Sequence, residues 1–211
     1  MALPDQSGWG IVGALLLLTA CEGDRREQRE SSAGADTTVP AMTSSETAKA
    51  RATIAGPPGS GIKGEVTFVE LAGNAPVPGV EIEARITGPA DRLTPGPHGL
   101  HIHEVGSGAC VPPYKAAQGH FDPGPAANPD PDVNHPFHLG DIPNLVVDRN
   151  GAGVVEATTS RITLSPGPLS LFDANGSSVI VHEKPDQGIP GPAGSGVSGG
   201  PRIACGVIEL E

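Results

Sequence analysis

The sequence has few aromatic side chains, few basic residues and a single long apolar run, and each shortage excludes a class of protein. Aromatic residues make up 3% and charged residues 18% of the 211 positions, whereas glycine and proline number 30 and 23. This composition disfavours a long helical bundle and favours turn-rich β-structure. The 13 Lys and Arg residues against 24 Asp and Glu give a net charge of -11, which disfavours nucleic acid as a partner.

The single long apolar run covers residues 9–20 and ends at Cys21. It is short for a membrane span but has the length typical of the apolar part of an export signal. The sequence Leu-Thr-Ala-Cys that ends at Cys21 resembles the bacterial lipoprotein signal, in which cleavage precedes the cysteine and that cysteine carries the lipid. We therefore predict a signal peptide over 1–20, a membrane anchor at Cys21, and export to the bacterial periplasm or cell envelope. The alternative is that the run is a buried segment of the fold.

The rest of the chain divides into a polar segment and one domain. Residues 21–55 contain almost no large apolar side chains and are predicted to form a flexible polar tether. From position 56 onward, short apolar runs alternate with Gly, Pro and Asn, a pattern typical of many antiparallel strands. The predicted domain therefore covers 56–211.

Strands are indicated at several places in this domain. Between 79 and 88 apolar and polar residues alternate strictly, which predicts a half-buried strand. Asn150 and Gly151 can supply the backbone angles of a tight hairpin. These signals indicate an all-β sandwich or barrel. The stretches 105–143 and 183–201 have no clear period, and loops of that length are usually functional. Further candidate strands are 63–71, 145–147, 153–157, 162–164, 178–182 and 202–210.

The seven histidines all lie between positions 98 and 182, in and around the two irregular stretches. His101 and His103 are two residues apart, which places both imidazoles on the same face of a strand and Ile102 on the other. A lone pair of this kind is a weak signal for a metal, because exposed strands carry such pairs by chance. The other histidines of the cluster strengthen it.

Five separated segments resemble the copper/zinc superoxide dismutases, in the same order and over about residues 61–209. They are HGLHIHE at 98–104, GHFDP at 119–123, HLGD at 138–141, VHEK at 181–184 and RIACG at 202–206. The resemblance implies a Greek-key β-sandwich or barrel of about eight antiparallel strands with two long functional loops.

The resemblance assigns His101, His103 and His182 to copper and makes His120 the imidazole that bridges copper to zinc. Four imidazoles suit this metal, because imidazole nitrogen binds both Cu(II) and Cu(I). For His98 it implies a structural hydrogen-bonding role without a metal. The alternative for the four ligands is a set of satisfied core histidines.

The zinc site departs from the family's pattern. The family usually has a zinc histidine eight residues after the bridge, where this chain has Asn128. His138 and Asp141 match two other ligands and make three with His120, whereas a closed structural zinc site has four. We predict that His135, the only spare imidazole nearby, is the fourth. Otherwise the protein binds copper alone, or binds zinc weakly through Asn128 or water.

Four further residues have roles that the resemblance implies. Asp186 matches a carboxylate that hydrogen-bonds one copper and one zinc histidine, and is otherwise a solvated loop acid. Arg202 matches the arginine that guides the anionic substrate to copper. Cys110 and Cys205 match the family's disulfide, which export to an oxidising compartment favours, and are otherwise a pair of buried thiols.

The implied activity is superoxide dismutase: two superoxide anions and two protons give dioxygen and hydrogen peroxide, by copper redox cycling with His120 as a proton carrier and Arg202 at the substrate. The cofactors would be one copper and one zinc per chain. A second copy in a homodimer is a possible partner. The alternative is a non-catalytic copper-binding or copper-delivery module on the same fold, since a fold does not fix an activity. A cell-surface adhesion domain is a third reading.

Overall fold

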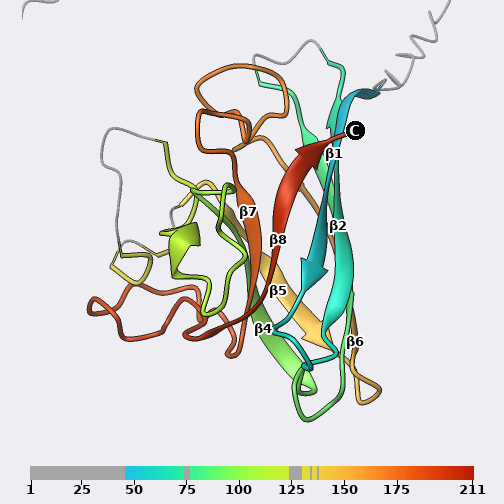
Figure 1. The fold of residues 1–211 in the computed structure, drawn as a ribbon. Helices are drawn as coiled ribbons and strands as arrows, with labels where there is room; N and C mark the ends of the chain where they lie inside the picture. The colour runs from blue at the N-terminus through green and yellow to red at the C-terminus, as the bar shows by residue number, and fades with distance from the viewer. Residues whose placement is uncertain (1–45, 74–76, 124–129, 134, 137) are drawn as a thin grey trace, which may run out of the picture. The chain divides into compact units, whose positions relative to one another are not determined.

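Eight antiparallel strands form a closed barrel in the computed structural model, which describes residues 46–73, 77–123, 130–133, 135–136 and 138–211 (Figure 1). The export signal, Cys21 and Asn128 lie outside the described residues. Around the barrel the strands follow the order β1-β2-β3-β6-β5-β4-β7-β8, and β8 pairs again with β1. The predicted all-β fold is confirmed. The strands are β1 (Glu46–Ala55), β2 (Lys63–Leu71), β3 (Val80–Thr87), β4 (Gly96–His103), β5 (Asp141–Val147), β6 (Ala152–Thr159), β7 (Ser178–His182) and β8 (Arg202–Leu210).

The barrel interior is filled by the apolar residues of each alternating strand. In β3, Val80, Ile82, Ala84 and Ile86 are all buried while the polar residues between them face outward, as the alternation predicts. Phe68 of β2 is fully buried in the same core. The helical structure of the described residues is one turn of 3-10 helix, η1 (Lys115–Ala117), and no helix among them is long and apolar enough to cross a membrane.

The predicted domain boundary at position 56 is wrong, because residues assigned to the tether form β1. This strand pairs with β2 on one side and β8 on the other. Its inward side chains Ala50, Ala52 and Ile54 are 0–1% exposed. The alternation is real but is carried by alanines, whose small apolar surface made the segment resemble a polar linker. The barrel domain therefore includes Glu46–Ala55.

Two other strand predictions need correction. Residues 162–164 form no strand, and Thr163 makes only a single bridge to Ser170. The buried carboxylate of Glu70 accepts the hydrogen bond of Leu164 N at 2.5 Å, so the backbone is satisfied without a neighbouring strand. The strand predicted at 145–147 begins earlier, at Asp141, so the first irregular stretch ends at 140.

The predicted hairpin between β5 and β6 is present. Gly151 has φ 78°, a left-handed conformation that glycine adopts without strain. Asp148 N donates to Ala152 O at 2.8 Å, which closes the turn.

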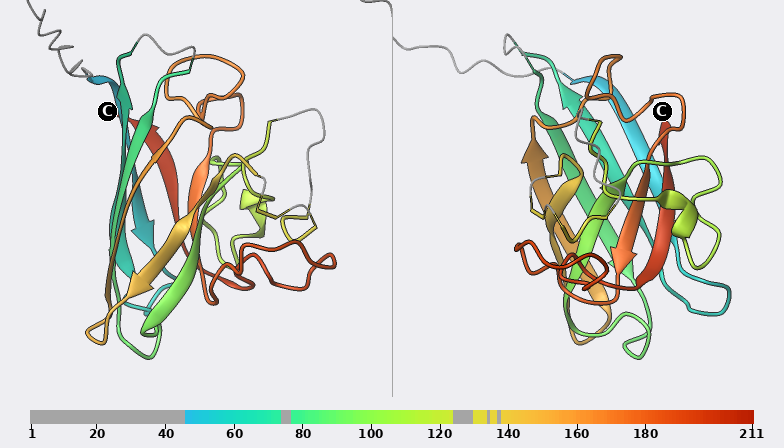
Figure 2. Two further views of the ribbon diagram at one scale, coloured as in Figure 1. Left: turned by 180° about the vertical axis from the view of Figure 1, so that it is seen from behind. Right: turned by 90° about the vertical axis from the view of Figure 1, so that its left-hand side faces the viewer.

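The described parts of both long irregular stretches lie on the same side of the barrel, beside β4 and β7, in the views of Figures 1 and 2. We call them the first long loop (104–140) and the second long loop (183–201). They explain why every residue of β4 from His98 to His103 is buried. Leu100 and Ile102 face the core, whereas the outward His101 and His103 are covered by the loops.

Shortening the chain tests the corrected boundary. We expect a chain that begins at residue 46 to unfold at the same temperature as the full chain, because it keeps β1. A chain that begins at residue 56 leaves the edges of β2 and β8 unpaired. Losing one buried isoleucine side chain such as Ile54 already costs about 2–5 kcal/mol, against a typical total stability of about 5–15 kcal/mol. Circular dichroism melting should show no cooperative transition for the shorter chain, and equal stability of the two chains would contradict the boundary.

Candidate metal centre

Four imidazoles assigned to copper converge on the outer face of β4. His101 and His103 come from β4, and His182 ends the neighbouring strand β7. His120 lies in the first long loop and forms an isolated antiparallel bridge with His103. One nitrogen of each of these four histidines lies within 4.8 Å of the others, and all four side chains are buried.

A close backbone approach holds the first long loop against β4. Phe121 N donates to Ile102 O at 2.8 Å, and Ile102 N donates to Gly140 O at 2.9 Å. A Cβ at position 140 would lie 2.3 Å from Ile102 O, so only glycine fits there. This contact brings His120 and the segment of His138 and Asp141 beside the strand.

The proton positions of this group favour a cation at its centre. Gln118 O accepts from His103 Nδ1 at 2.9 Å, and Gly200 O accepts from His182 Nδ1 at 3.0 Å. Each neutral ring has one N–H, so the two Nε2 atoms, which lie 3.4 Å apart, face each other with lone pairs. His101 Nδ1 and His120 Nε2 are buried without a partner. Four unprotonated nitrogens around one point fit a copper ion.

A second group contains the residues predicted for zinc, including His135. His120, His135, His138 and Asp141 place their ligand atoms within 4.8 Å of one another. Asp141 is central, since Oδ1 lies 2.7 Å from His120 Nδ1 and Oδ2 lies 3.5 Å from His135 Nδ1. His135 Nδ1 and both nitrogens of His138 are buried without a hydrogen-bond partner. Three nitrogens and one carboxylate make the four-ligand set that a closed zinc site requires.

Asp186 joins the two groups. Its Oδ2 accepts from His101 Nε2 at 3.0 Å, and its Oδ1 accepts from His135 Nε2 at 2.5 Å. These bonds place the protons on the outer nitrogens and leave the inner Nδ1 atoms free to bind metal. Asp186 N in turn donates to Asn144 Oδ1 at 2.9 Å, which fixes the carboxylate. The structure therefore places Asp186 as the predicted link and not as a solvated acid.

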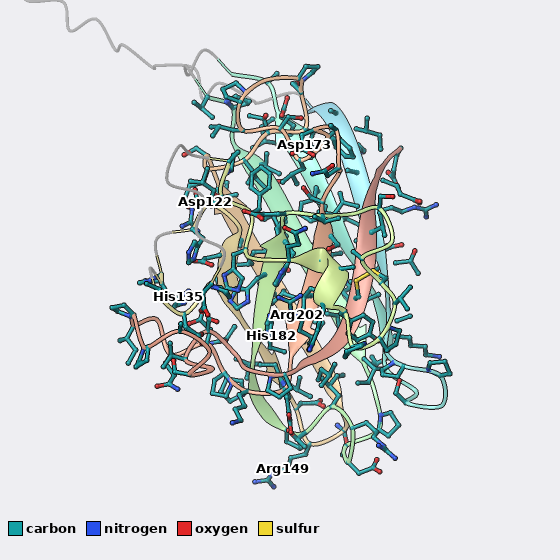
Figure 3. All side chains as sticks on the ribbon, turned by 60° about the vertical axis from the view of Figure 1, so that its left-hand side comes forward. Asp122, His135, Arg149, Asp173, His182 and Arg202 are labelled. Carbon is teal, nitrogen blue, oxygen red and sulfur yellow. A yellow bond between two sulfur atoms is a disulfide. The ribbon has the colours of Figure 1, made fainter. Side chains whose placement is uncertain are left out.

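Arg202 lies at the start of β8 beside His182, and both line a cavity of about 400 Å³ (Figure 3). Its guanidinium donates to Tyr114 O at 2.6 Å and to Gln118 O. Gln118 O is also the acceptor of His103, so one carbonyl orients both the cation and a copper histidine.

The predicted disulfide between Cys110 and Cys205 is confirmed and ties the first long loop to β8. It closes a loop of 95 residues, which would stabilise the fold by roughly 4–5 kcal/mol in the chain-entropy model. The loop that it holds carries the carbonyls of Tyr114 and Gln118. The disulfide therefore also supports the position of Arg202.

Comparison with known proteins agrees with this geometry. A family model described as copper/zinc superoxide dismutase (SODC) matches residues 62–208. The chain belongs to the copper/zinc superoxide dismutase family. Copper and zinc are the cofactors of the family, and the two groups of ligands provide a site for each.

Individual relatives of this family are similar over more than half of the chain. The protein named superoxide dismutase [Cu-Zn] from Deinococcus radiodurans is 36% identical over 157 residues, which cover 69% of this chain and 79% of the relative. One from Salmonella typhimurium is 38% identical over 125 residues, 56% of this chain and 66% of the relative. A solved SOD-like protein from Bacillus subtilis superposes with a TM-score of 0.59 at 26% identity, covering 77% of this chain and 99% of the other.

Burial keeps His103, His120 and His182 of this family member neutral, as metal binding requires. Desolvation lowers the pKa of His103 and His182 well below the ordinary value. It also lowers the pKa of His120 to about 3, although Asp141 acts in the opposite direction. Burial alone would raise the pKa of Asp186, but hydrogen bonds from His101 and His135 hold it well below its usual range. The carboxylate is therefore charged at neutral pH.

The site of this superoxide dismutase family member also uses groups that the sequence did not reveal. Arg161 donates to His138 O at 3.1 Å and to Asp141 O at 2.5 Å, and so fixes the backbone of two zinc-group residues. The carbonyls of Tyr114, Gln118 and Gly200 orient site side chains. Backbone carbonyls carry no residue-type signal, and an isolated arginine after β6 has no spacing that marks it as part of a site.

Replacing His135 tests the fourth zinc ligand. We expect the purified protein to contain one copper and one zinc per chain, and His135→Ala to keep copper while its zinc affinity falls by at least about 10–100-fold, because three ligands remain. Elemental analysis by mass spectrometry after dialysis measures both metals. Val133→Ala, at an exposed position of the same loop, is the control and should keep both. A His135→Ala protein that still holds one zinc would remove His135 from the site.

Proposed function

We propose that this protein disproportionates superoxide to dioxygen and hydrogen peroxide by copper redox cycling. The observation that carries the proposal is the group of four buried imidazoles whose nitrogens converge next to Arg202 at a cavity. Copper bound there would supply one-electron oxidation and reduction, since imidazole accepts both of its oxidation states. The relatives from Deinococcus radiodurans and Salmonella typhimurium are named superoxide dismutases, which supports the same activity for this chain.

Arg202 would bind and orient the anionic substrate. The chain carries a net charge of -11, so an anion approaches against the overall field and needs a local cation at the cavity. The guanidinium has five N–H donors. Two of its nitrogens are held by Tyr114 O and Gln118 O, which fixes the group beside His182 while leaving further donors for the substrate.

His120 would hold one of the two protons that the reaction consumes. Its Nδ1 faces Asp141 at 2.7 Å, whereas its Nε2 faces the copper group and has no partner. A proton taken up at Nε2 would therefore lie inside the copper group and next to the site of reduction. His101 packs against the ring of His120 with centroids 3.9 Å apart, which restricts its movement.

A copper-delivery module on the same fold is the second candidate, and two observations disfavour it. Delivery proteins usually hold Cu(I) with soft thiolate or thioether ligands. Both cysteines in the described part of the chain, Cys110 and Cys205, are joined in a disulfide and cannot serve. Arg202 at the cavity also has a use in binding an anion but none in delivering a metal.

The role of Arg202 can be tested in the metal-loaded protein. We expect the wild type to dismutate superoxide with a rate that falls as salt rises, because exposed charges are screened. Arg202→Ile should lower the rate roughly tenfold or more, the loss of one hydrogen bond to a charged group being about 1.5–3 kcal/mol, and should flatten the salt dependence. Pulse radiolysis measures both rates.

Arg202→Lys keeps the charge without the fork of donors and should lie between the wild type and Arg202→Ile. Copper content, measured in parallel, should be unchanged in both variants. An Arg202→Ile protein as fast as the wild type would refute the steering role, and an inactive wild type with both metals bound would refute the proposed function.

We also propose that the protein is exported to the bacterial periplasm or cell envelope and anchored there through Cys21. The apolar run at 9–20 and the lipoprotein-like sequence before Cys21 support this localisation. The Cys110–Cys205 disulfide is consistent with an oxidising compartment. The polar residues that follow Cys21 would then separate the barrel from the membrane.

Labelling tests the anchor. In a bacterium that expresses the full chain, a radioactive or clickable fatty acid should label the wild type, and Cys21→Ser should abolish the label, because that thiol is the acceptor. Membrane fractionation should move the variant to the soluble fraction. Label that persists in Cys21→Ser, or a wild type that is soluble and unlabelled, would rule out the anchor.

A further inference from the structure

Asp132 is a buried carboxylate of the first long loop that belongs to neither metal group. Its side chain is 4% exposed. It accepts hydrogen bonds from Gly196 N at 2.6 Å, from Ser198 N at 3.0 Å and from Ser198 Oγ at 2.6 Å. Its own carbonyl accepts from Gly191 N at 2.7 Å. A single residue of the first long loop therefore accepts four hydrogen bonds from the second.

The hydrogen bonds from Gly196 and Ser198 allow the carboxylate of Asp132 to be buried. A buried charge is costly unless it is paired or hydrogen-bonded. Burial raises the pKa of Asp132, but the bonds from Ser198 and Gly196 outweigh this and lower it below the ordinary value. The charged carboxylate therefore holds residues 196–200 of the second long loop by hydrogen bonds. This segment consists mostly of glycine and serine and has little apolar surface with which to pack.

The anchored segment lies directly against the copper ligand His182. Gly199 has φ 116°, and a Cβ there would lie 2.7 Å from His182 Cβ. Gly200 O accepts from His182 Nδ1 at 3.0 Å. The position of this carbonyl sets both the tilt of the His182 ring and the nitrogen that carries its proton.

The same segment also supports the carboxylate that joins the two metal groups. Ser198 and Asp186 form an antiparallel bridge, and Gln187 N donates to Val197 O at 2.9 Å. Displacing residues 196–198 would therefore shift Asp186 as well as the backbone at Gly200.

We propose that Asp132 is a positioning residue, whose carboxylate fixes residues 196–200 of the second long loop and through them the ring of His182. It also fixes part of the lining of the 400 Å³ cavity, which Lys184 and Arg202 line as well. The consequence for turnover rests on the proposed function, whereas the consequence for loop order and ligand geometry does not.

The experiment compares the copper- and zinc-loaded full chain with three variants. Asp132→Asn keeps the shape but turns an NH2 group toward the backbone donors, and Ser198→Ala removes a single hydroxyl donor as a milder change. Glu183→Gln is the matched control, because it removes one negative charge from an exposed position of the same loop. Hydrogen exchange of the loop amides and the electron paramagnetic resonance spectrum of Cu(II) are the readouts.

We expect Asp132→Asn to raise the exchange rate of the amides at 191–199 by about tenfold or more and to leave the barrel strands unchanged. The Cu(II) spectrum should change, and activity should fall by about 10–100-fold, as when other groups that orient metal ligands are lost. Ser198→Ala should shift the same readouts less. Glu183→Gln should match the wild type in loop exchange and in the Cu(II) spectrum.

A wild-type copper spectrum and wild-type loop exchange in Asp132→Asn would overturn the proposal. So would exchange that rises equally in the barrel strands, since that indicates a general loss of stability. If Asp132→Asn does not fold, Ser198→Ala decides by the same criteria. If the wild type has no dismutase activity but Asp132→Asn still changes loop exchange and the Cu(II) spectrum, the positioning role of Asp132 is supported and the proposed function is refuted.

Discussion

Six imidazoles and two carboxylates are packed between β4 and the two long loops, and their inner lone pairs repel one another unless cations lie between them. His103 Nε2 and His182 Nε2, 3.4 Å apart with their protons used elsewhere, show this constraint most directly. Burial lowers the pKa of both rings, so proton uptake does not relieve the repulsion at neutral pH. Metal binding is therefore part of what makes this side of the barrel stable, as well as the source of its chemistry.

The strands provide only part of the site, and hydrogen bonds provide the rest. His101, His103 and His182 are set by the pairing of β4 with β7, whereas His120, His135 and His138 come from a loop with little regular structure. That loop is held by the Cys110–Cys205 disulfide, by Arg161 on its backbone carbonyls and by the carboxylates of Asp186 and Asp132. These polar contacts add to the apolar packing of Ala109, Tyr114 and Ala117 against Ile180.

The sequence could predict those features that depend on residue type and spacing. Alternation marked β3, and the two-residue spacing placed His101 and His103 on one face. The resemblance to the family supplied three zinc ligands, and the need for a fourth pointed to His135. Features that depend on backbone atoms or on small side chains could not be predicted from the sequence. β1 was missed because its inward residues are mainly alanines, and no pattern marks the carbonyl of Gln118, which orients both Arg202 and His103.

The contact between the second long loop and His182 explains why position 199 of that loop is glycine. A side chain at position 199 would clash with the histidine, so the backbone itself must approach and present Gly200 O. Lys184 is the only Lys or Arg residue of this loop. Lys184 and Arg202 are the basic residues that line the cavity, and Asp130 and Asp132 also line it. In a chain with a net charge of -11, the attraction of an anion then depends on these two groups and the bound metals and not on a broad basic surface.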